Sequence, residues 1–185
     1  THGGHPYMNL FEGNVCPSIV FDNALGSSRY NTAFRNHMER SGQGVKFNLN
    51  AVEVQMNNLY QTIVGNVLGR PGDKGAYEVT GGAPGVYKLG CNQARCGVID
   101  PRVRQTILRH GHYDTITKKI HWDSALDVRD LPDSLYLRGK PGFFMDLPWP
   151  AIGPDLDPMV GELPAKRRFE SRSREVVPDA AYRSN

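Results

Sequence analysis

The sequence predicts an all-β protein whose main part is a parallel β-helix, a solenoid in which successive coils stack their strands, followed by a Pro-rich irregular C-terminal tail. Three observations support this fold class. A short motif recurs along the chain, several short segments are rich in β-forming residues, and 20 glycines and 13 prolines occur among 185 residues. Such a glycine and proline content is unfavourable for a helical bundle, because both residues weaken helix interiors.

The recurring motif is a six-residue segment that begins with Asn or Gln, has an apolar residue two positions later and ends with Asn or His. Its four copies are residues 9–14, 31–36, 61–66 and 105–110. Their spacing fits a unit of about 22 residues with one insertion, and it leaves room for one unmatched coil. A unit of this length with little helical periodicity is typical of one solenoid coil.

Stacked coils would align equivalent residues in columns along the solenoid. Identical amides in a column can form a hydrogen-bonded ladder, and we expect two ladders: Asn14, Asn36 and Asn66, and Asn9, Asn31, Gln61 and Gln105. Two columns are expected to face the core: Phe11, Ala33, Ile63 and Ile107, and Cys16, Met38, Leu68 and His112. Chance matches in a chain rich in Asn and Gly are the alternative, but the apolar columns accompany both amide columns, which favours stacking.

Further strands are expected where short, β-rich segments are bounded by Gly, Asn or Asp. These segments are residues 18–21, 45–49 and 115–117. Residues 101–109 have some helical character, but they overlap the fourth copy of the motif and are interpreted as strand.

Two parts of the chain depart from the coil pattern. Residues 69–100 are rich in glycine and predict a long excursion from the coils, which otherwise occupy residues 1–140. Residues 141–185 contain seven prolines and a basic run at 166–168. They predict an extended tail that packs on the solenoid or on a partner, with Trp149 or the Phe143–Phe144 pair as the apolar contact.

Composition and charge restrict the function classes. Hydrophobic residues make up 39% of the chain and charged residues 22%, which excludes wholesale disorder. The net charge of +3 is too small to indicate nucleic-acid binding, and no apolar run approaches the ~18 residues of a membrane span. The chain opens on Thr1 without the features of a signal peptide, so we expect that a leader was removed or that a longer chain precedes it.

Residues 9–14, 31–37 and 64–69 resemble coils of right-handed parallel β-helix proteins of the pectate-lyase-like superfamily. Residues 131–137, followed by 140–141 and 147–150, are similar to the closing segment of secreted bacterial members. The resemblance implies a right-handed, single-stranded parallel β-helix and the C-terminal portion of a larger secreted protein. It implies little about activity, because the superfamily includes lyases, hydrolases, epimerases, adhesins and phage tailspikes.

Cysteine and histidine offer a few candidate sites. Cys91 and Cys96 lie in the Gly-rich region, which has little core of its own, and are expected to form a disulfide if the protein is secreted. A metal-binding pair is the less favoured alternative, because no second Cys pair follows at zinc-site spacing. His110, His112 and Asp114 form a His-x-His-x-Asp pattern that could bind a metal, although a structural role within the columns is favoured. No cofactor is predicted; calcium is the one that the resemblance leaves open, since a lyase of this kind uses an Asp cluster.

Saccharide contacts are expected on the outward columns, which contain Glu12, Phe34, Val64 and Leu108, and then Gly13, Arg35, Gly65 and Arg109. The guanidinium groups of Arg35 and Arg109 could bind the carboxylates of an acidic sugar, and Glu12 could act as an acid or base. His37 and Tyr113 complete the candidate contacts. The alternative is that these are ordinary solvated residues, and no complete catalytic set is evident.

Two functions follow from this interpretation. The first is an extracellular β-helix protein that recognises or processes a polysaccharide, as a lyase or glycoside hydrolase if it is an enzyme. The second is a structural or adhesive component of a cell-surface or filamentous assembly. In both, residues 7–16 are expected to pair with strands from an upstream fragment of the same precursor or from another subunit, because a solenoid leaves its first coil unpaired. Neither nucleic acid nor a membrane span is expected.

Overall fold

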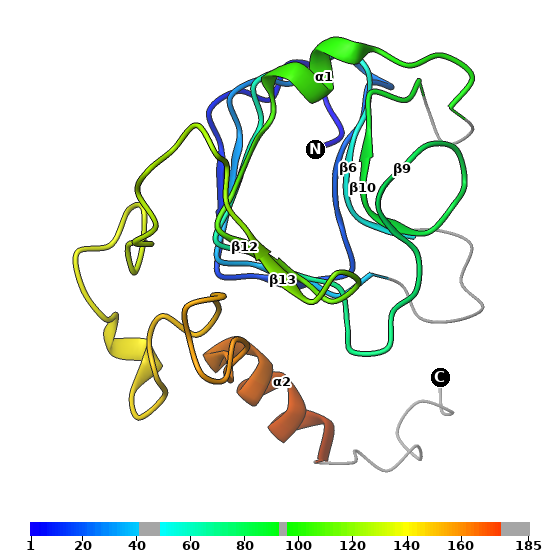
Figure 1. The fold of residues 1–185 in the computed structure, drawn as a ribbon. Coiled ribbons are helices and arrows are strands. Elements are labelled where there is room, and N and C mark those ends of the chain that lie inside the picture. Colours follow the sequence, from blue (N-terminus) through cyan, green and yellow to red (C-terminus); the bar gives the residue numbers. More distant parts are fainter. Residues whose placement is uncertain (41–48, 93–95, 175–185) are drawn as a thin grey trace, which may run out of the picture.

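The computed structural model describes residues 1–40, 49–92 and 96–174. Within them, short strands are stacked around a common interior, and the C-terminal segment lies outside the stack (Figure 1). The strands are β1 (Leu10–Glu12), β2 (Val15–Cys16), β3 (Ile19–Phe21), β4 (Thr32–Phe34), β5 (His37–Met38), β6 (Asn50–Val54), β7 (Thr62–Val64), β8 (Val67–Leu68), β9 (Ala76–Val79), β10 (Gly85–Leu89), β11 (Leu108–His110), β12 (His112–Asp114) and β13 (Lys119–His121). The helices are α1 (Pro101–Thr106), the 3-10 helix η1 (Gly142–Phe144) and α2 (Pro164–Arg174).

The strands form three sheets, each made of strands that are distant in sequence. The sheet orders are β1-β4-β7-β11, β3-β6-β10-β9 and β13-β12-β8-β5-β2. Every pair is parallel except β12 with β13, which are antiparallel. One sheet is therefore mixed.

The predicted fold class, an all-β right-handed parallel β-helix, is wrong for this structure. The described residues form a mixed α/β fold with two α-helices, and their strands lie in three separate open sheets, one of them mixed. Among these residues no closed or solenoid sheet is present. The error has a physical cause: amide columns require only that short parallel strands be in register, and this condition is met by open sheets as well as by a solenoid.

The expected amide ladder at the end of the β1, β4 and β7 strands is confirmed. The side chain of Asn14 donates from Nδ2 to Oδ1 of Asn36 at 2.9 Å, and Asn36 donates in the same way to Asn66 at 3.0 Å. The backbone N–H of Asn14 and of Asn36 donates to the same oxygen that accepts from its side chain. These bonds satisfy buried polar groups at the bend and hold the strands in register.

The second ladder is confirmed for three of its four members. Asn9 donates to Asn31 at 2.8 Å, and Asn31 donates to Gln61 at 3.2 Å. Gln105 does not join them, because β11 pairs with β7 so that Leu108 lies opposite Thr62. The fourth copy of the motif therefore lies two residues later than predicted.

This shift changes the residues that continue each column. Arg109 lies opposite Ile63 and so continues the core column of Phe11 and Ala33. Asp114, rather than His112, lies opposite Leu68. The predicted core positions of Ile107 and His112 in these columns are thus wrong, because the helix α1 occupies the residues that were interpreted as strand.

Helix α1 has a clear local cause. Asp100 is its N-cap and accepts a hydrogen bond from the backbone N–H of Arg102, and Pro101 occupies the first turn. Both residues are favourable at these positions. Hydrogen bonds from Arg102 hold the pKa of Asp100 down at about 2.

Among the other expected strands, 18–21 is confirmed by β3, residues 45–48 lie outside the described residues, and 115–117 form the turn between β12 and β13.

One corner of the stack has left-handed backbone at four aligned positions. Gly13, Gly65 and Gly111 have φ of 72°, 64° and 56°, and Arg35 has φ of 49°. Glycine adopts such values without steric cost. Arg35 is the exception in this column, and its side chain reaches into the C-terminal segment.

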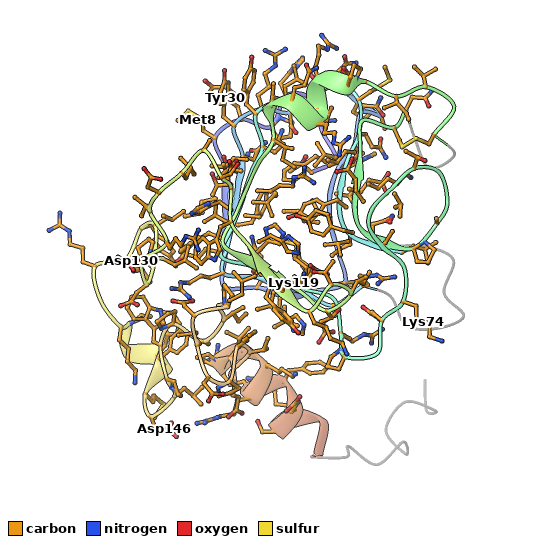
Figure 2. All side chains as sticks on the ribbon, in the orientation of Figure 1. Met8, Tyr30, Lys74, Lys119, Asp130 and Asp146 are labelled. Carbon is orange, nitrogen blue, oxygen red and sulfur yellow. A yellow bond between two sulfur atoms is a disulfide. The ribbon has the colours of Figure 1, made fainter. Side chains whose placement is uncertain are left out.

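The interior between the sheets is filled with side chains (Figure 2). The core includes Phe21, Met38, Val52, Ile63 and Tyr87, none of which is exposed. Residues 69–100, expected to be an excursion, include β9 and β10, which complete a sheet with β3 and β6. The glycine-rich turns of this segment make its sequence look irregular, although it contains two ordinary strands.

A second apolar cluster joins the C-terminal segment to the stack. Phe144, Leu147 and Ile152 are buried there with Val67, and Val15 and Tyr113 pack against the same cluster. Val15, Val67 and Tyr113 are aligned on the sheet of β2, β5, β8 and β12. The segment is not extended throughout, since it contains η1 and α2, and α2 lies outside this sheet (Figure 1).

Candidate functional site

A polar cavity of about 400 Å³ lies at the end of the stack formed by β11 and β13. Its lining residues are Tyr77, Arg104, Gln105, Ile107, Arg109, His121, Trp122, Asp123 and Ser124. Arg109 lines this cavity and lies at the last level of a core column, because β11 is the terminal strand of its sheet. The two-residue shift of the fourth motif copy therefore creates the site.

Two guanidinium groups meet one carboxylate at the rim of this polar cavity. Glu78 accepts from Nη1 of Arg109 at 2.9 Å and lies 3.2 Å from Nε of Arg104. The guanidinium of Arg109 also lies 5.6 Å and 5.1 Å from the ring centroids of Tyr77 and Tyr87. The group of three ionic side chains carries one excess positive charge, which the carboxylate of Asp123 in the cavity lining offsets.

The β12–β13 hairpin contributes an imidazole held by a buried carboxylate. Nε2 of His121 donates to Oδ2 of Asp114 at 2.7 Å, and the same oxygen accepts from the hydroxyl of Thr117. Oδ1 of Asp114 accepts from the backbone N–H of Ile116 and of Thr117. Because both carboxylate oxygens are occupied, the orientation of His121 at the cavity wall is well determined.

Beneath the cavity, His112 and two tyrosines form a buried polar layer. Nε2 of His112 is hydrogen-bonded to the hydroxyl of Tyr77 at 2.9 Å. Burial, together with the nearby His121 and Arg109, lowers the pKa of His112 to about 3. Burial likewise raises the pKa of Tyr77 to about 12 and that of Tyr87 well above its ordinary value. All three side chains are therefore neutral at pH 7.

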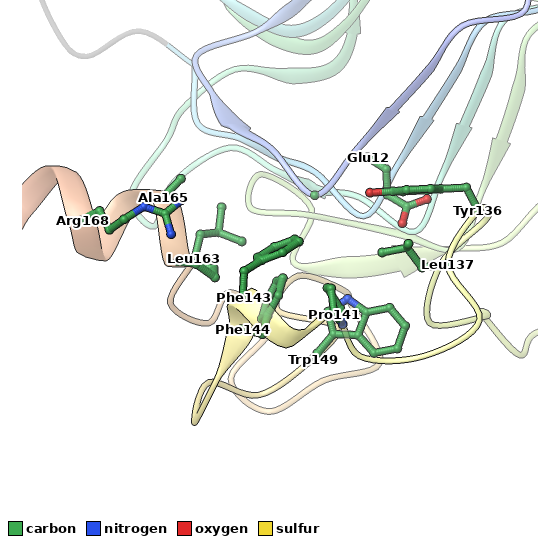
Figure 3. A pocket seen from close by; sticks show the side chains of 12 residues that line it. Glu12, Tyr136, Leu137, Pro141, Phe143, Phe144, Trp149, Leu163, Ala165 and Arg168 are labelled. Carbon is green, nitrogen blue, oxygen red and sulfur yellow. The ribbon is translucent and has the colours of Figure 1, made fainter.

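A second cavity, of about 180 Å³, is lined by aromatic side chains between β1 and the C-terminal segment (Figure 3). Tyr136, Phe143 and Trp149 surround it, with Glu12 at one side and Arg168 at the other. Oε2 of Glu12 accepts from the backbone N–H of Leu135 at 3.0 Å. This aromatic cavity brings together rings that can stack on a sugar and a carboxylate that can accept hydrogen bonds.

The sequence-predicted saccharide residues do not form one site. Glu12 lies in the aromatic cavity and Arg109 in the polar cavity. Nε2 of His37 donates to the carbonyl oxygen of Gly69 at 3.0 Å, and Tyr113 packs under the C-terminal segment. His37 and Tyr113 thus lie outside both cavities.

Arg35 was expected to face solvent, and this expectation is wrong. Its side chain is only 2% exposed. Its guanidinium donates to Oδ1 and Oδ2 of Asp155 at 2.9 and 2.8 Å, and to the carbonyl oxygens of Leu131, Pro132 and Ile152. Residues distant in sequence thus surround the guanidinium of Arg35, and its role in this fold is structural. Phe34, also expected outside, is fully buried beside Leu131.

The expected disulfide between Cys91 and Cys96 is present. The His-x-His-x-Asp pattern has other partners: Nε2 of His110 donates to the carbonyl oxygen of Val128 at 2.8 Å, and Nδ1 accepts from the N–H of Asp123. No group of three or more potential metal-ligating side chains occurs among residues 1–40, 49–92 and 96–174. Nor does this part of the chain contain a helix long and apolar enough to cross a membrane.

Several cavity residues escaped the sequence interpretation. The sequence predicts a strand at Arg104 and Gln105, and it places Glu78, which pairs with Arg104 and Arg109 beside the cavity, in an excursion. His121 and Trp122 follow a turn at residues 115–118, where the sequence predicts a strand over 115–117. The Asp-Pro pair at 100–101, a helix-start signal, was the feature that could have corrected the alignment.

The likeness of the repeated motifs to pectate-lyase-like proteins remains a prediction made from short segments. Comparisons of the chain with protein-family models, with curated proteins and with solved structures found no match.

Proposed function

We propose that this protein recognises an acidic polysaccharide outside the cell, and that the polar cavity binds a carboxylate-bearing sugar unit. The observation that carries the proposal is the convergence of Arg104 and Arg109 with the ring of Trp122 in one cavity of about 400 Å³. Guanidinium groups bind carboxylates through paired hydrogen bonds, and an aromatic ring offers a face to the sugar.

The donors of the cavity suit an acidic sugar, because two guanidinium groups converge there, although the carboxylates of Glu78 and Asp123 balance their charge. Glu78 neutralises only one of the two guanidinium groups that it contacts. Arg104 is largely exposed, so it can turn towards a ligand at little cost, whereas Arg109 is fixed by Tyr77 and Tyr87. A sugar carboxylate would thus meet one preorganised donor and one adaptable donor.

The disulfide supports the extracellular part of this proposal. Cys91 and Cys96 close a short loop, and such bonds persist in oxidising compartments. The aromatic cavity would provide a second contact, where a sugar could stack on Tyr136 or Trp149 beside Glu12. A polymer could in this way be held at two places.

Binding of polygalacturonate and of its methyl-esterified form, measured by calorimetry, tests the proposal. The two polymers differ in charge but share a backbone, so we expect binding of the first and much weaker binding of the second. Replacing both Arg104 and Arg109 by Gln should weaken binding at least about tenfold, since each charge-assisted hydrogen bond is worth roughly 1.5–3 kcal/mol.

The matched control is Arg167→Gln, which removes an exposed arginine that pairs with Asp146 and Glu162 away from the cavity. Its affinity should equal that of the unmodified protein. Equal binding of both polymers, or equal loss in the control and in the double variant, would contradict a carboxylate site. New unsaturated or reducing ends in the incubated polymer would show that the protein also processes it.

A second candidate is a structural or adhesive role in an assembly, in which residues 7–16 pair with strands of an upstream fragment or of another subunit. The observation in its favour is that β1 and β2 each pair on one side only. Native mass spectrometry with hydrogen exchange of the natural assembly tests it. A single free species whose amides in residues 7–16 exchange rapidly would exclude this role.

A further inference from the structure

The three sheets have their first strands at the same end of the stack. β1, β2 and β3 are each the terminal strand of a sheet order, so each has one unpaired edge. Thr1 covers part of the β3 edge: its amino group donates to the carbonyl oxygen of Val20, and its carbonyl oxygen accepts from the N–H of Asp22. The edges of β1 and β2 have no such cover among the described residues.

The repeat shows which backbone groups face outward on these edges. At the next level of the stack, the N–H of Thr32 donates to the carbonyl oxygen of Asn9, and the N–H of His37 donates to that of Asn14. Leu10 and Val15 occupy the equivalent positions one level earlier. Their N–H groups therefore point away from the stack and have no acceptor within the described residues.

The amide ladders end at this level with free acceptors. In both ladders, Oδ1 or Oε1 of each residue accepts from the backbone N–H and the side-chain NH₂ of the preceding level. Asn9 and Asn14 donate in this way to Asn31 and Asn36, but within the described chain nothing donates to their own Oδ1 atoms. The pattern thus leaves a pair of acceptors, five residues apart, at the open end.

The interior is also open between these edges. A cavity of about 290 Å³ is lined there by Phe11, Cys16 and Ile19, which are only partly buried against the core, together with Met38. The opposite end is different: Arg109, His112 and His121 form a polar layer over the core. Of the two ends of the stack, it is therefore the β1 end that leaves apolar side chains uncovered.

We propose that the β1 and β2 edges bind an extended chain segment that continues the stack by one parallel level. This segment has Asn or Gln at two positions five residues apart, and an apolar residue two positions after each of them. Its amides would donate to Oδ1 of Asn9 and of Asn14, and its carbonyl oxygens would accept from the N–H groups of Leu10 and Val15. Its apolar side chains would cover Phe11 and Cys16. Main-chain bonds would supply affinity and the amide pair would set the register.

This inference deepens the second candidate function, on which it rests, by stating the chemistry of the partner. A second copy of the same open end fits less well. Two such ends facing each other would bring Oδ1 of Asn9 and Asn14 against identical acceptors, and would pair the strands antiparallel. A parallel segment instead supplies the donors that both acceptors lack.

A synthetic peptide with the sequence of residues 29–40 serves as the probe, because it contains Asn31 and Asn36 at the required spacing. Cys16 is the one cysteine outside the disulfide and reports on the open end. At about 1 mM peptide we expect alkylation of Cys16 by iodoacetamide, and exchange of the Leu10 and Val15 amides, to slow about twofold or more. The matched control peptide has Leu in place of both asparagines and should have no effect. The Asn14→Leu protein should respond less than the unmodified protein.

Each alternative outcome is decisive. Unchanged alkylation and exchange with the asparagine peptide would overturn the proposal. Equal protection by the leucine peptide would overturn the amide register while leaving an assembly role at this edge intact. Protection that rises with protein concentration in the absence of peptide, and that Asn14→Leu does not alter, would show that a second copy occupies the edge.

Discussion

His112 lies at the junction of the core and the polar cavity, with no exposed surface. Its ring is hydrogen-bonded to Tyr77 and packs edge-on against Tyr87, and His121 stacks on its other side at 5.3 Å. Register places it opposite Asn66, so it occupies the end of an asparagine column. A neutral imidazole suits this place because it can accept and donate hydrogen bonds without carrying charge into the core.

The buried imidazole predicts a loss of stability in acid. The folded pKa of His112 is about 3, against 6.5 when it is exposed, so below pH 6.5 the unfolded chain takes up a proton that the folded chain does not. The contribution is therefore complete above about pH 6.5 and falls by up to about 1.4 kcal/mol per pH unit as the pH drops towards 3. Denaturant unfolding at several pH values measures this slope.

The matched variant is His112→Asn. It gives position 112 the residue type that is found at position 66, one level earlier in the same asparagine column. Its free energy of unfolding should vary less with pH than that of the unmodified protein over the same range. His5→Asn removes an exposed imidazole instead and serves as the control. Identical pH slopes for the His112 variant and the unmodified protein would show that His112 does not resist protonation.

At the scale of elements, the bends between short strands are held by side-chain amides. β1, β4 and β7 have three residues each, and β2, β5 and β8 only two. Strands this short contribute few main-chain bonds, so the ladder at the bend supplies a large share of the hydrogen bonds between levels. Asn36 is its central member and is almost fully buried.

Replacing Asn36 by Leu should lower the free energy of unfolding by about 3 kcal/mol. The shape is nearly kept, but Asn14 and Asn66 lose a partner, and the carbonyl oxygen of Phe11 loses a donor. Buried polar groups left without partners cost roughly 1–3 kcal/mol each. Asn14→Leu is the control at the exposed end of the same ladder, where we expect about 1 kcal/mol. Thermal or denaturant unfolding would reveal the difference, and equal losses would argue against the ladder.

At the scale of the whole molecule, one buried arginine joins the stack to the C-terminal segment. Arg35 leaves the stack at a left-handed corner and binds three carbonyl oxygens and the carboxylate of Asp155. Gly153 gives it room, because a Cβ there would lie 2.0 Å from Nη1 of Arg35. Phe144, Leu147 and Ile152 then cover the sheet, and the aromatic cavity forms between the two parts.

Arg35→Met should therefore loosen residues 131–160. The variant keeps the apolar stem but leaves carbonyl groups and Asp155 without their donor, and a cost of about 3 kcal/mol is expected. Hydrogen exchange should speed up in these residues while β6 and β10 keep their protection. The control variant Arg167→Gln removes an exposed ion pair on the same segment and should change the rate of hydrogen exchange little. Exchange that rises equally throughout the stack would indicate general destabilisation instead.

Local periodicity was enough to identify the levels of the stack. The amide and apolar columns of the first three motif copies are side-chain patterns repeated in the sequence, and the hydrogen bonds among Asn14, Asn36 and Asn66 follow from them. The pairing of Cys91 with Cys96 was likewise accessible, because two cysteines close in sequence can meet without knowledge of the fold.

The rest depended on contacts that no local pattern encodes. Whether strands close into a solenoid or remain three open sheets is decided by the chain between them, including α1 and the hairpin of β12 and β13. The same holds for the functional candidates. An arginine on a short strand is exposed or buried according to what covers it, and Arg35 is covered by residues about 100 positions away in sequence.

By itself, the sequence determined which residues repeat and hence the register of the first levels, because hydrogen-bonded columns require identical groups at equal spacing. Only the tertiary structure decided that Arg109 ends a core column beside Glu78, and that His121 meets Asp114 across a turn. Those groups come together because the fourth level is shifted by α1 and closed by an antiparallel strand. A polar cavity arises where the apolar repeat stops, and the place where it stops is a property of the packed chain.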